Sequence, residues 1–244
     1  IFLVLCFPLG GLEYFVNSKI RFTTLTLVSL VLTSCGSRQA GLITSNVVNP
    51  NDIAAISKFR SCCGHTYRSS GEPDCSMKTY LRAKSVFGNS TNQVKIYAPF
   101  DGEVISINES EHRIDCYGVG TKQGSQIEIA PYARPDLKVR LFHVIPIVSV
   151  GKVVRSGEHI AYADLRGCVN GSPSGPSDFD VSVEGTLNRK LPYFDYLSDS
   201  ALQAWINRGL SSREAASIGR SQREADPCVQ FGGAKCTAET IFFP

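Results

Sequence analysis

Three carboxylates alternate along residues 177–185, which read SDFDVSVEG. Side chains of a β-strand alternate between its two faces, so a strand here has an acidic face and an apolar face: Asp178, Asp180, Ser182 and Glu184 lie opposite Phe179, Val181 and Val183. Carboxylates spaced in this way repel one another unless they are solvated or paired with cations. We therefore expect either a solvated or Arg/Lys-paired face or a site for a hard cation such as calcium, which carboxylates suit better than zinc.

Cysteines are the second group of residues that could carry chemistry. The chain has nine, and setting aside Cys6 and Cys35 near the start leaves seven: Cys62, Cys63, Cys75, Cys116, Cys168, Cys228 and Cys236. In an exported protein these are disulfide candidates. We predict Cys228–Cys236, Cys116–Cys168, and Cys75 with Cys62 or Cys63. A zinc site of Cys62, Cys63, His65 and Cys75 is the alternative, but no C-x-x-C pair supports it.

Residues 17–37, NSKIRFTTLTLVSLVLTSCGS, have the layout of an export signal. Lys19 and Arg21 form a basic start, an apolar run follows to Leu32, and small residues precede Cys35. The ending LTSC resembles the bacterial lipobox, which implies that Cys35 carries a lipid. The apolar run is too short for a bilayer span, which disfavours a transmembrane anchor. We predict a lipid-anchored protein of the bacterial cell envelope, with residues 1–17 a candidate for spurious upstream sequence.

The composition is that of a globular protein with many turns. Of 244 residues, 43% are hydrophobic, and 21 Gly and 12 Pro are scattered along the chain, which indicates a β-rich fold. The net charge of +3 is small and dispersed, so we expect no nucleic-acid partner.

The pattern along the chain predicts five segments. They are a signal segment (1–35), a tether (36–52), a Cys-rich lead-in (53–92), a β domain (93–191) and a small helical C-terminal appendage (192–244). Apolar residues at helical spacing predict a short helix over 51–59. The dipeptide Asp101-Gly102, between VKIYAPF and EVISI, predicts a hairpin. The expected fold class is mainly β, an antiparallel sandwich or split barrel with a short N-terminal helix and the C-terminal appendage.

Residues 95–185 carry four motifs in a recognisable order: YAPFDGEVISI, GSQIEIAP, RLFHVIPIVSVGKVVRSGEHIAYA and SDFDVSVEG. The framework resembles the lysostaphin/LytM-type zinc metallopeptidases, which cut peptide cross-links in peptidoglycan. The resemblance covers under half of the chain. It implies a duplicated hybrid motif, an antiparallel β fold with a metal groove.

The same resemblance assigns positions to five residues. His143 stands at the family's strand histidine, Asp178 and Asp180 replace its His-x-His pair, and His65 is the candidate for its first ligand, with Ser69 in place of the next one. By family position, His143 and Asp178 are catalytic and His65 and Asp180 bind metal. A hydroxyl is a poor zinc ligand, and aspartate titrates far below histidine, so we predict a degenerate site without a resident cofactor.

Two histidines have simpler interpretations. His143 alternates with Val139 and Leu141, which also fits a core-edge histidine, and His65 fits a loop histidine held by a neighbouring disulfide. The predicted function is an envelope lipoprotein that binds peptidoglycan or an envelope partner. The alternatives are an active zinc peptidase using His65, His143 and Asp180, and a disulfide-stapled structural lipoprotein.

Overall fold

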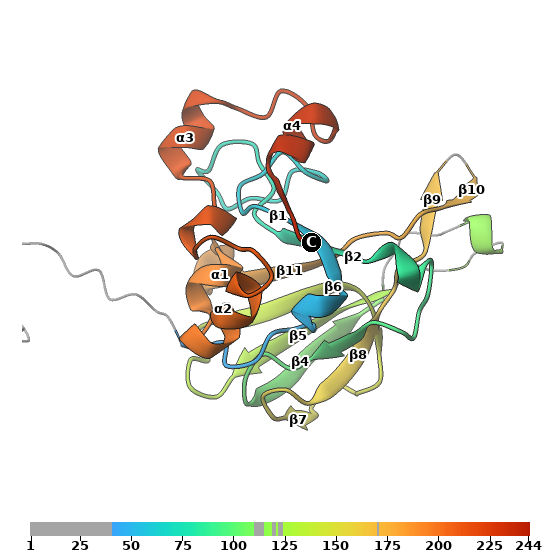
Figure 1. Cartoon of the computed structure of the whole chain (residues 1–244). Helices are drawn as coiled ribbons and strands as arrows, with labels where there is room; N and C mark the ends of the chain where they lie inside the picture. Colours follow the sequence, from blue (N-terminus) through green and yellow to red (C-terminus); the bar gives the residue numbers. More distant parts are fainter. Residues whose placement is uncertain (1–40, 110–114, 119–120, 122–123, 170) are drawn as a thin grey trace, which may run out of the picture. The chain divides into compact units, whose positions relative to one another are not determined.

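The computed structural model describes residues 41–109, 115–118, 121, 124–169 and 171–244 (Figure 1). The predicted export signal and its Cys35 lie outside these residues. Within the described part, no helix has both the length and the apolar character needed to cross a membrane.

Strands make up most of the regular structure. Their bounds are β1 (Ile53–Ser57), β2 (Thr79–Ala83), β3 (Lys95–Tyr97), β4 (Gly102–Asn108), β5 (Ser125–Pro131), β6 (Lys138–Pro146), β7 (Val153–Val154), β8 (His159–Ala163), β9 (Gly167–Val169), β10 (Ser172–Ser174), β11 (Phe179–Glu184), β12 (Lys190–Leu191) and β13 (Thr240–Phe242). The helices are short: α1 (Tyr193–Tyr196), α2 (Asp199–Ile206), α3 (Arg220–Ala225) and α4 (Gly233–Ala238). Single 3-10 turns occur at Pro50–Asp52, Ser85–Phe87, Asp115–Tyr117, Thr186–Asn188 and Glu214–Ala216.

One antiparallel sheet dominates the described residues (Figure 1). Its main path runs β13-β1-β2-β11-β6-β5-β4-β7, with β12 on β11 and with β8 joining β6 to β3. β9 and β10 form a separate two-stranded sheet. The predicted mainly antiparallel β fold with small helical parts is confirmed. β11, which carries the acidic segment, is central, because it pairs with β2 on one side and β6 on the other.

The core is filled by the apolar faces of these strands and by α1 and α2. Val139, Leu141 and Val181 are fully buried, and Trp205 of α2 packs with them in the same cluster. The Trp205 indole nitrogen donates to Asn46 Oδ1 at 2.7 Å, so the one polar atom of its ring is satisfied. Ser198 caps α2 by accepting from Ala201 N, as expected of a serine at a helix start.

Three sequence predictions are corrected in this region. The predicted helix over 51–59 is instead the 3-10 turn followed by strand β1, whose apolar residues are buried within the sheet. The predicted tether is wrong for residues 41–52, because Ile43, Val47 and Val48 are core residues. The Asp101-Gly102 hairpin is also wrong, since β3 pairs with β8 while β4 pairs with β5 and β7. A Cβ on Gly102 would lie 2.2 Å from Ala130 O, so this glycine allows close strand approach.

The predicted helical appendage, 192–244, is integrated into the fold. Tyr193, Phe194 and Leu197 belong to the main core, and β13 pairs with β1 at the sheet edge. The buried Arg223 of α3 binds the carbonyl oxygen of Arg60 and the carboxylate of Glu239. The segment therefore completes the sheet and covers its edge.

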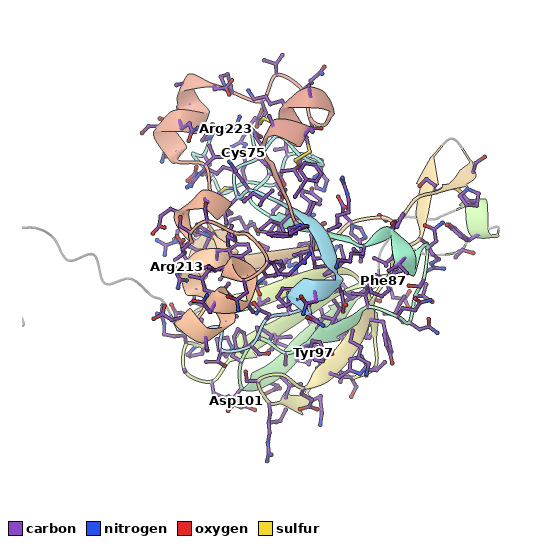
Figure 2. The ribbon with its side chains drawn as sticks, in the orientation of Figure 1. Cys75, Phe87, Tyr97, Asp101, Arg213 and Arg223 are labelled. Carbon is purple, nitrogen blue, oxygen red and sulfur yellow. A yellow bond between two sulfur atoms is a disulfide. The ribbon has the colours of Figure 1, made fainter. Side chains whose placement is uncertain are left out.

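Three disulfides occur among the described residues. Cys116–Cys168 is as predicted, whereas the other two are Cys62–Cys228 and Cys63–Cys236. The predicted Cys228–Cys236 pair is wrong, because each of these cysteines is joined to the Cys-rich lead-in. The predicted pairing of Cys75 is also wrong: its thiol is free and buried, close to Arg223 in Figure 2. Burial raises the pKa of that thiol to about 11, so it is unreactive at neutral pH.

Candidate functional site

The acidic face of β11 is buried and paired with cations. Asp180 is 0% exposed and Glu184 1%, because β2 and β6 flank the strand on both sides. Of the two states expected for this face, the structure has the Arg/Lys-paired one. The pairing cations come from β6, from β12 and from the residue just before β2.

Lys78 is the partner of Asp180. Its ammonium lies 3.1 Å from Asp180 Oδ2, and both side chains are sealed from solvent. Aromatic rings surround the same ammonium, with Phe142 at 4.0 Å and Tyr67 at 4.8 Å from the nitrogen to the ring centroids. Cation–π attraction and the ion pair together offset part of the cost of burying the charge.

His65 completes the contacts of Lys78. Its Nε2 lies 3.4 Å from the ammonium, and its Nδ1 lies 2.9 Å from the carbonyl oxygen of Thr66. An ammonium can only donate, so Nε2 accepts and the ring proton resides on Nδ1. The loop that carries His65 is fixed by Gly64, whose φ of +65° and close packing on Tyr80 exclude a larger residue.

His143 approaches Asp180 from β6. Its Nε2 lies 3.8 Å from Asp180 Oδ2, beyond hydrogen-bond distance. The backbone at His143 has φ +57°, a left-handed conformation that is rare within a strand. Strained backbone at one residue of a paired strand is held by the surrounding sheet, here including a hydrogen bond from Asp164 N to His143 O at 2.8 Å.

The protonation of Asp180 is set mainly by burial. Desolvation raises its pKa to about 7, although the charge and hydrogen bond of Lys78 act in the opposite direction. Asp180 therefore titrates near neutrality, unlike an ordinary aspartate.

Glu184 lies at the centre of a second cationic cluster. Lys190 Nζ donates to its Oε1 at 2.7 Å, Tyr67 donates to the same oxygen, and Arg140 Nη2 lies 3.3 Å from Oε2. Burial opposes ionisation, but the hydrogen bonds from Lys190 and Tyr67 and the nearby cations outweigh it, so the pKa of Glu184 is lowered. Glu184 is thus an ionised carboxylate beneath a cationic surface.

Two other family positions lie apart from this cluster. Asp178 is half-exposed and pairs with Arg82, at 3.0 Å, rather than with Lys78. Ser69 accepts a hydrogen bond from the backbone of Lys190 at 2.7 Å and is buried, so its hydroxyl serves the loop structure. Of the four predicted site residues, the structure brings three together: His65 and Asp180 contact Lys78, and His143 lies 3.8 Å from Asp180.

These residues do not fit a zinc ion. Zinc binds nitrogen and oxygen ligands at about 2.0–2.2 Å, whereas His65 and Asp180 each contact the Lys78 ammonium, whose positive charge would repel a metal. Among the described residues, no group of three or more His, Cys, Asp or Glu side chains could hold a metal ion. The carboxylates of β11 likewise already have lysine and arginine partners.

Sequence reasoning missed Lys78, Tyr67, Arg140 and Lys190. One signal was present: Lys78 and Arg82 are four positions apart, so they share one face of an extended chain, as Asp178 and Asp180 do, and the two segments pair through β2 and β11. Opposite charges on one face of each of two segments favour their pairing. In the Cys-rich lead-in, the motif positions point to the cysteines, His65 and Ser69 and not to Lys78.

Comparison with known proteins gives likenesses in fold. No protein-family model matches the chain, and no curated protein does. Among solved structures, lysostaphin in solution matches with a TM-score of 0.37 and 15% identity over 60% of this chain. The catalytic domain of lysostaphin from Staphylococcus simulans matches with a TM-score of 0.38 and 12% identity over 59% of this chain. Helicobacter pylori Csd3 matches with a TM-score of 0.37 and 12% identity over 83% of this chain.

The matched lengths differ among these structures. The chain spans 49% of full lysostaphin and 45% of Csd3, but 90% of the lysostaphin catalytic domain. At identities of 12–15% these likenesses concern the fold alone.

Proposed function

We propose that this chain is a lipid-anchored protein of the bacterial cell envelope whose β domain is a non-hydrolytic relative of LytM-type peptidases. In this proposal the lipid is on Cys35, and the domain binds peptidoglycan or an envelope protein through a groove beside β11 that is lined by His65, Lys78, Arg140 and His143. No metal takes part, and the groove residues act by binding alone.

The observation that supports the proposal is the position of Lys78. The two residues that the family pattern assigns to the metal, His65 and Asp180, both contact its ammonium. A lysine can balance the charge of Asp180, and its three N–H donors can satisfy neighbouring acceptors. It cannot act as a Lewis acid or generate hydroxide at neutral pH, which hydrolysis by a metallopeptidase requires.

Metal content and peptidoglycan binding test this proposal directly. We expect the purified full chain to contain far less than one zinc per molecule by plasma mass spectrometry, and to sediment with purified peptidoglycan sacculi without releasing fragments. Zinc near one per molecule, together with cleavage abolished by His143→Ala, would instead establish an active peptidase. Failure to bind either sacculi or any envelope protein in crosslinked cells would leave a purely structural role.

Labelling with a radioactive fatty acid tests the anchor. We expect the wild-type chain expressed in bacteria to incorporate the label and Cys35→Ser to lose it. Equal labelling of the two proteins would refute lipidation at Cys35.

A further inference from the structure

Two adjoining clefts lie beside the Lys78 and Glu184 clusters. An outer cleft of about 610 Å³ and an inner cleft of about 220 Å³ share Tyr67 and Arg140 as lining residues. Arg68 and Lys190 also line the outer cleft, and Lys78 lines the inner one. None of the described residues that line either cleft is Asp or Glu.

The carboxylates lie beneath the cations. Asp180 and Glu184 are buried, at 0% and 1% exposure, under Lys78, Lys190 and Arg140. The side chain of Arg140 is 22% exposed. Lys78 and Lys190 are themselves buried, at 3% and 4% exposure, so the charges that an anion entering the clefts meets first are the partly exposed Arg140 and Arg68. Asp74, the partner of Arg68, is 60% exposed.

The two arginines keep hydrogen-bond donors available. Arg140 directs Nη2 to Glu128 and Glu184, and its Nε is buried without a hydrogen-bond partner among the described residues, so Nη1 is the nitrogen with which it can bind a ligand. Arg68 uses Nε for Asp74 and Nη1 for the carbonyl oxygen of Glu72. A guanidinium has five N–H donors, so each arginine retains donors that match a carboxylate.

The shape favours a chain rather than a small ion. The outer cleft is in the size range of ligand pockets and is open, and the rings of Tyr67 and Phe142 give the inner cleft an apolar wall. Hydroxyls of Thr66 and Ser70 line the outer part, where they can bond to peptide groups.

We infer that the adjoining clefts form a groove for an acidic peptide, with Arg140 and Arg68 contacting its carboxylates. This inference rests on the proposed binding function and names the chemical class of ligand for that site. The partly exposed Arg140 and Arg68, with no Asp or Glu among the described lining residues, make the groove selective for anionic over neutral peptides.

Calorimetric titration of the full chain tests the inference with matched probes. One probe is an acidic pentapeptide with a free C-terminal carboxylate. The other is its neutral form, with glutamine for glutamate and an amidated C-terminus. We expect the acidic form to bind about tenfold or more tightly, because charge-assisted hydrogen bonds are lost in the neutral form.

Three variants locate the binding. Arg140→Gln and Arg68→Gln should each weaken binding of the acidic peptide several-fold. Arg134→Gln should not, although Arg134 is likewise a surface arginine paired with an aspartate, because it lies in the β5–β6 turn. Arg68, 38% exposed, is the safer variant should Arg140→Gln fail to fold.

The outcomes separate this inference from the proposed function. Binding to sacculi with equal affinity for both peptides, or with no effect of Arg68→Gln and Arg140→Gln, would overturn the acidic-peptide groove and leave the proposed function standing. Binding of inorganic phosphate with no binding of the acidic peptide would also overturn it, because the groove would then be a site for small ions. Zinc-dependent cleavage of sacculi would refute the proposed function itself.

Discussion

Lys78 and Asp180 form an ion pair, 3.1 Å from ammonium nitrogen to carboxylate oxygen, with both side chains sealed from solvent. The pair joins the Cys-rich lead-in to the central strand β11, since Lys78 directly precedes β2. A buried ion pair is weak evidence of added stability, but removal of one partner is costly because it leaves an uncompensated charge.

Replacement of Lys78 should therefore be strongly destabilising at alkaline pH. Lys78→Met keeps an unbranched side chain among the aromatic rings but leaves Asp180 without its cation. We expect a loss of about 3–5 kcal/mol in the free energy of unfolding at pH 8, and a smaller loss at pH 5, where Asp180 is protonated. Urea unfolding at the two pH values measures both. Lys78→Met/Asp180→Asn is the control and should lose less at pH 8 than Lys78→Met; equal losses at both pH values would contradict this account.

The raised pKa of Asp180 predicts a pH-dependent stability. In the folded protein its pKa is about 7, against 3.8 as the ordinary value. Between these values the folded chain holds a proton that the unfolded chain releases, so this group's contribution to stability falls as the pH rises from about 4 to about 7. At roughly 1.36 kcal/mol per pKa unit, the difference between these two pKa values corresponds to a change of at most about 4 kcal/mol in the free energy of unfolding.

The comparison that isolates this effect is wild type against Asp180→Asn. We expect the free energy of unfolding, measured in urea at several pH values from 4.5 to 8, to fall more steeply with pH in the wild type. Parallel curves for the two proteins would show that Asp180 has an ordinary pKa.

The stability contributions of the two disulfides at Cys62 and Cys63 should not be additive. Each closes a loop of more than 160 residues, with sequence separations of 166 and 173. When one is present, the other closes only a ring on the order of 10 residues. From the entropy of the unfolded chain, removal of either disulfide alone should lower the free energy of unfolding by about 3 kcal/mol, and removal of the remaining one should lower it by about 5 kcal/mol more.

Paired alanine variants measure this difference. The variants Cys62→Ala/Cys228→Ala and Cys63→Ala/Cys236→Ala should each be moderately destabilised in urea unfolding, and the quadruple variant should lose more than twice as much. Strictly additive losses would show that unfolded-chain entropy is not the main cause.

The left-handed backbone at His143 predicts a glycine preference. Glycine adopts φ near +57° without steric cost, whereas alanine does not. We expect His143→Gly to be more stable than His143→Ala by roughly 1 kcal/mol in thermal or urea unfolding, the reverse of the usual order within a strand. A lower stability for His143→Gly would indicate that the imidazole contacts, and not the backbone, determine the site.

The sequence predicts the strands of the β domain well because their periodicity is local. β5, β6 and β11 lie where alternating apolar residues placed them. The Asp101-Gly102 signal failed because glycine has two uses, and here it permits close approach of two strands rather than a turn. The predicted helix over 51–59 failed because pairing of β1 with β2 and β13 overrode its helical spacing.

The site was only partly predictable for a different reason. His65, His143 and Asp180 were identified from motif positions, and the structure places them together. Lys78 was not, because its role depends on the pairing of β2 with β11, a contact between residues about 100 apart in sequence. Burial of Asp180 also depends on that pairing, so its protonation could not be inferred from the alternation of residues 178–184.

The native partners of Cys62 and Cys63 have a consequence for oxidative folding. Each of these cysteines forms its native disulfide with a residue more than 160 positions away, whereas the free Cys75 lies only 13 and 12 positions from them. Short loops close fastest, so the first crosslinks to form in the unfolded chain should be the non-native pair Cys228–Cys236, only eight positions apart, and pairs of Cys75 with Cys62 or Cys63, and these must later be exchanged. Cys75 is then a transient partner that the finished core hides, and the protein should depend on a disulfide isomerase to mature efficiently.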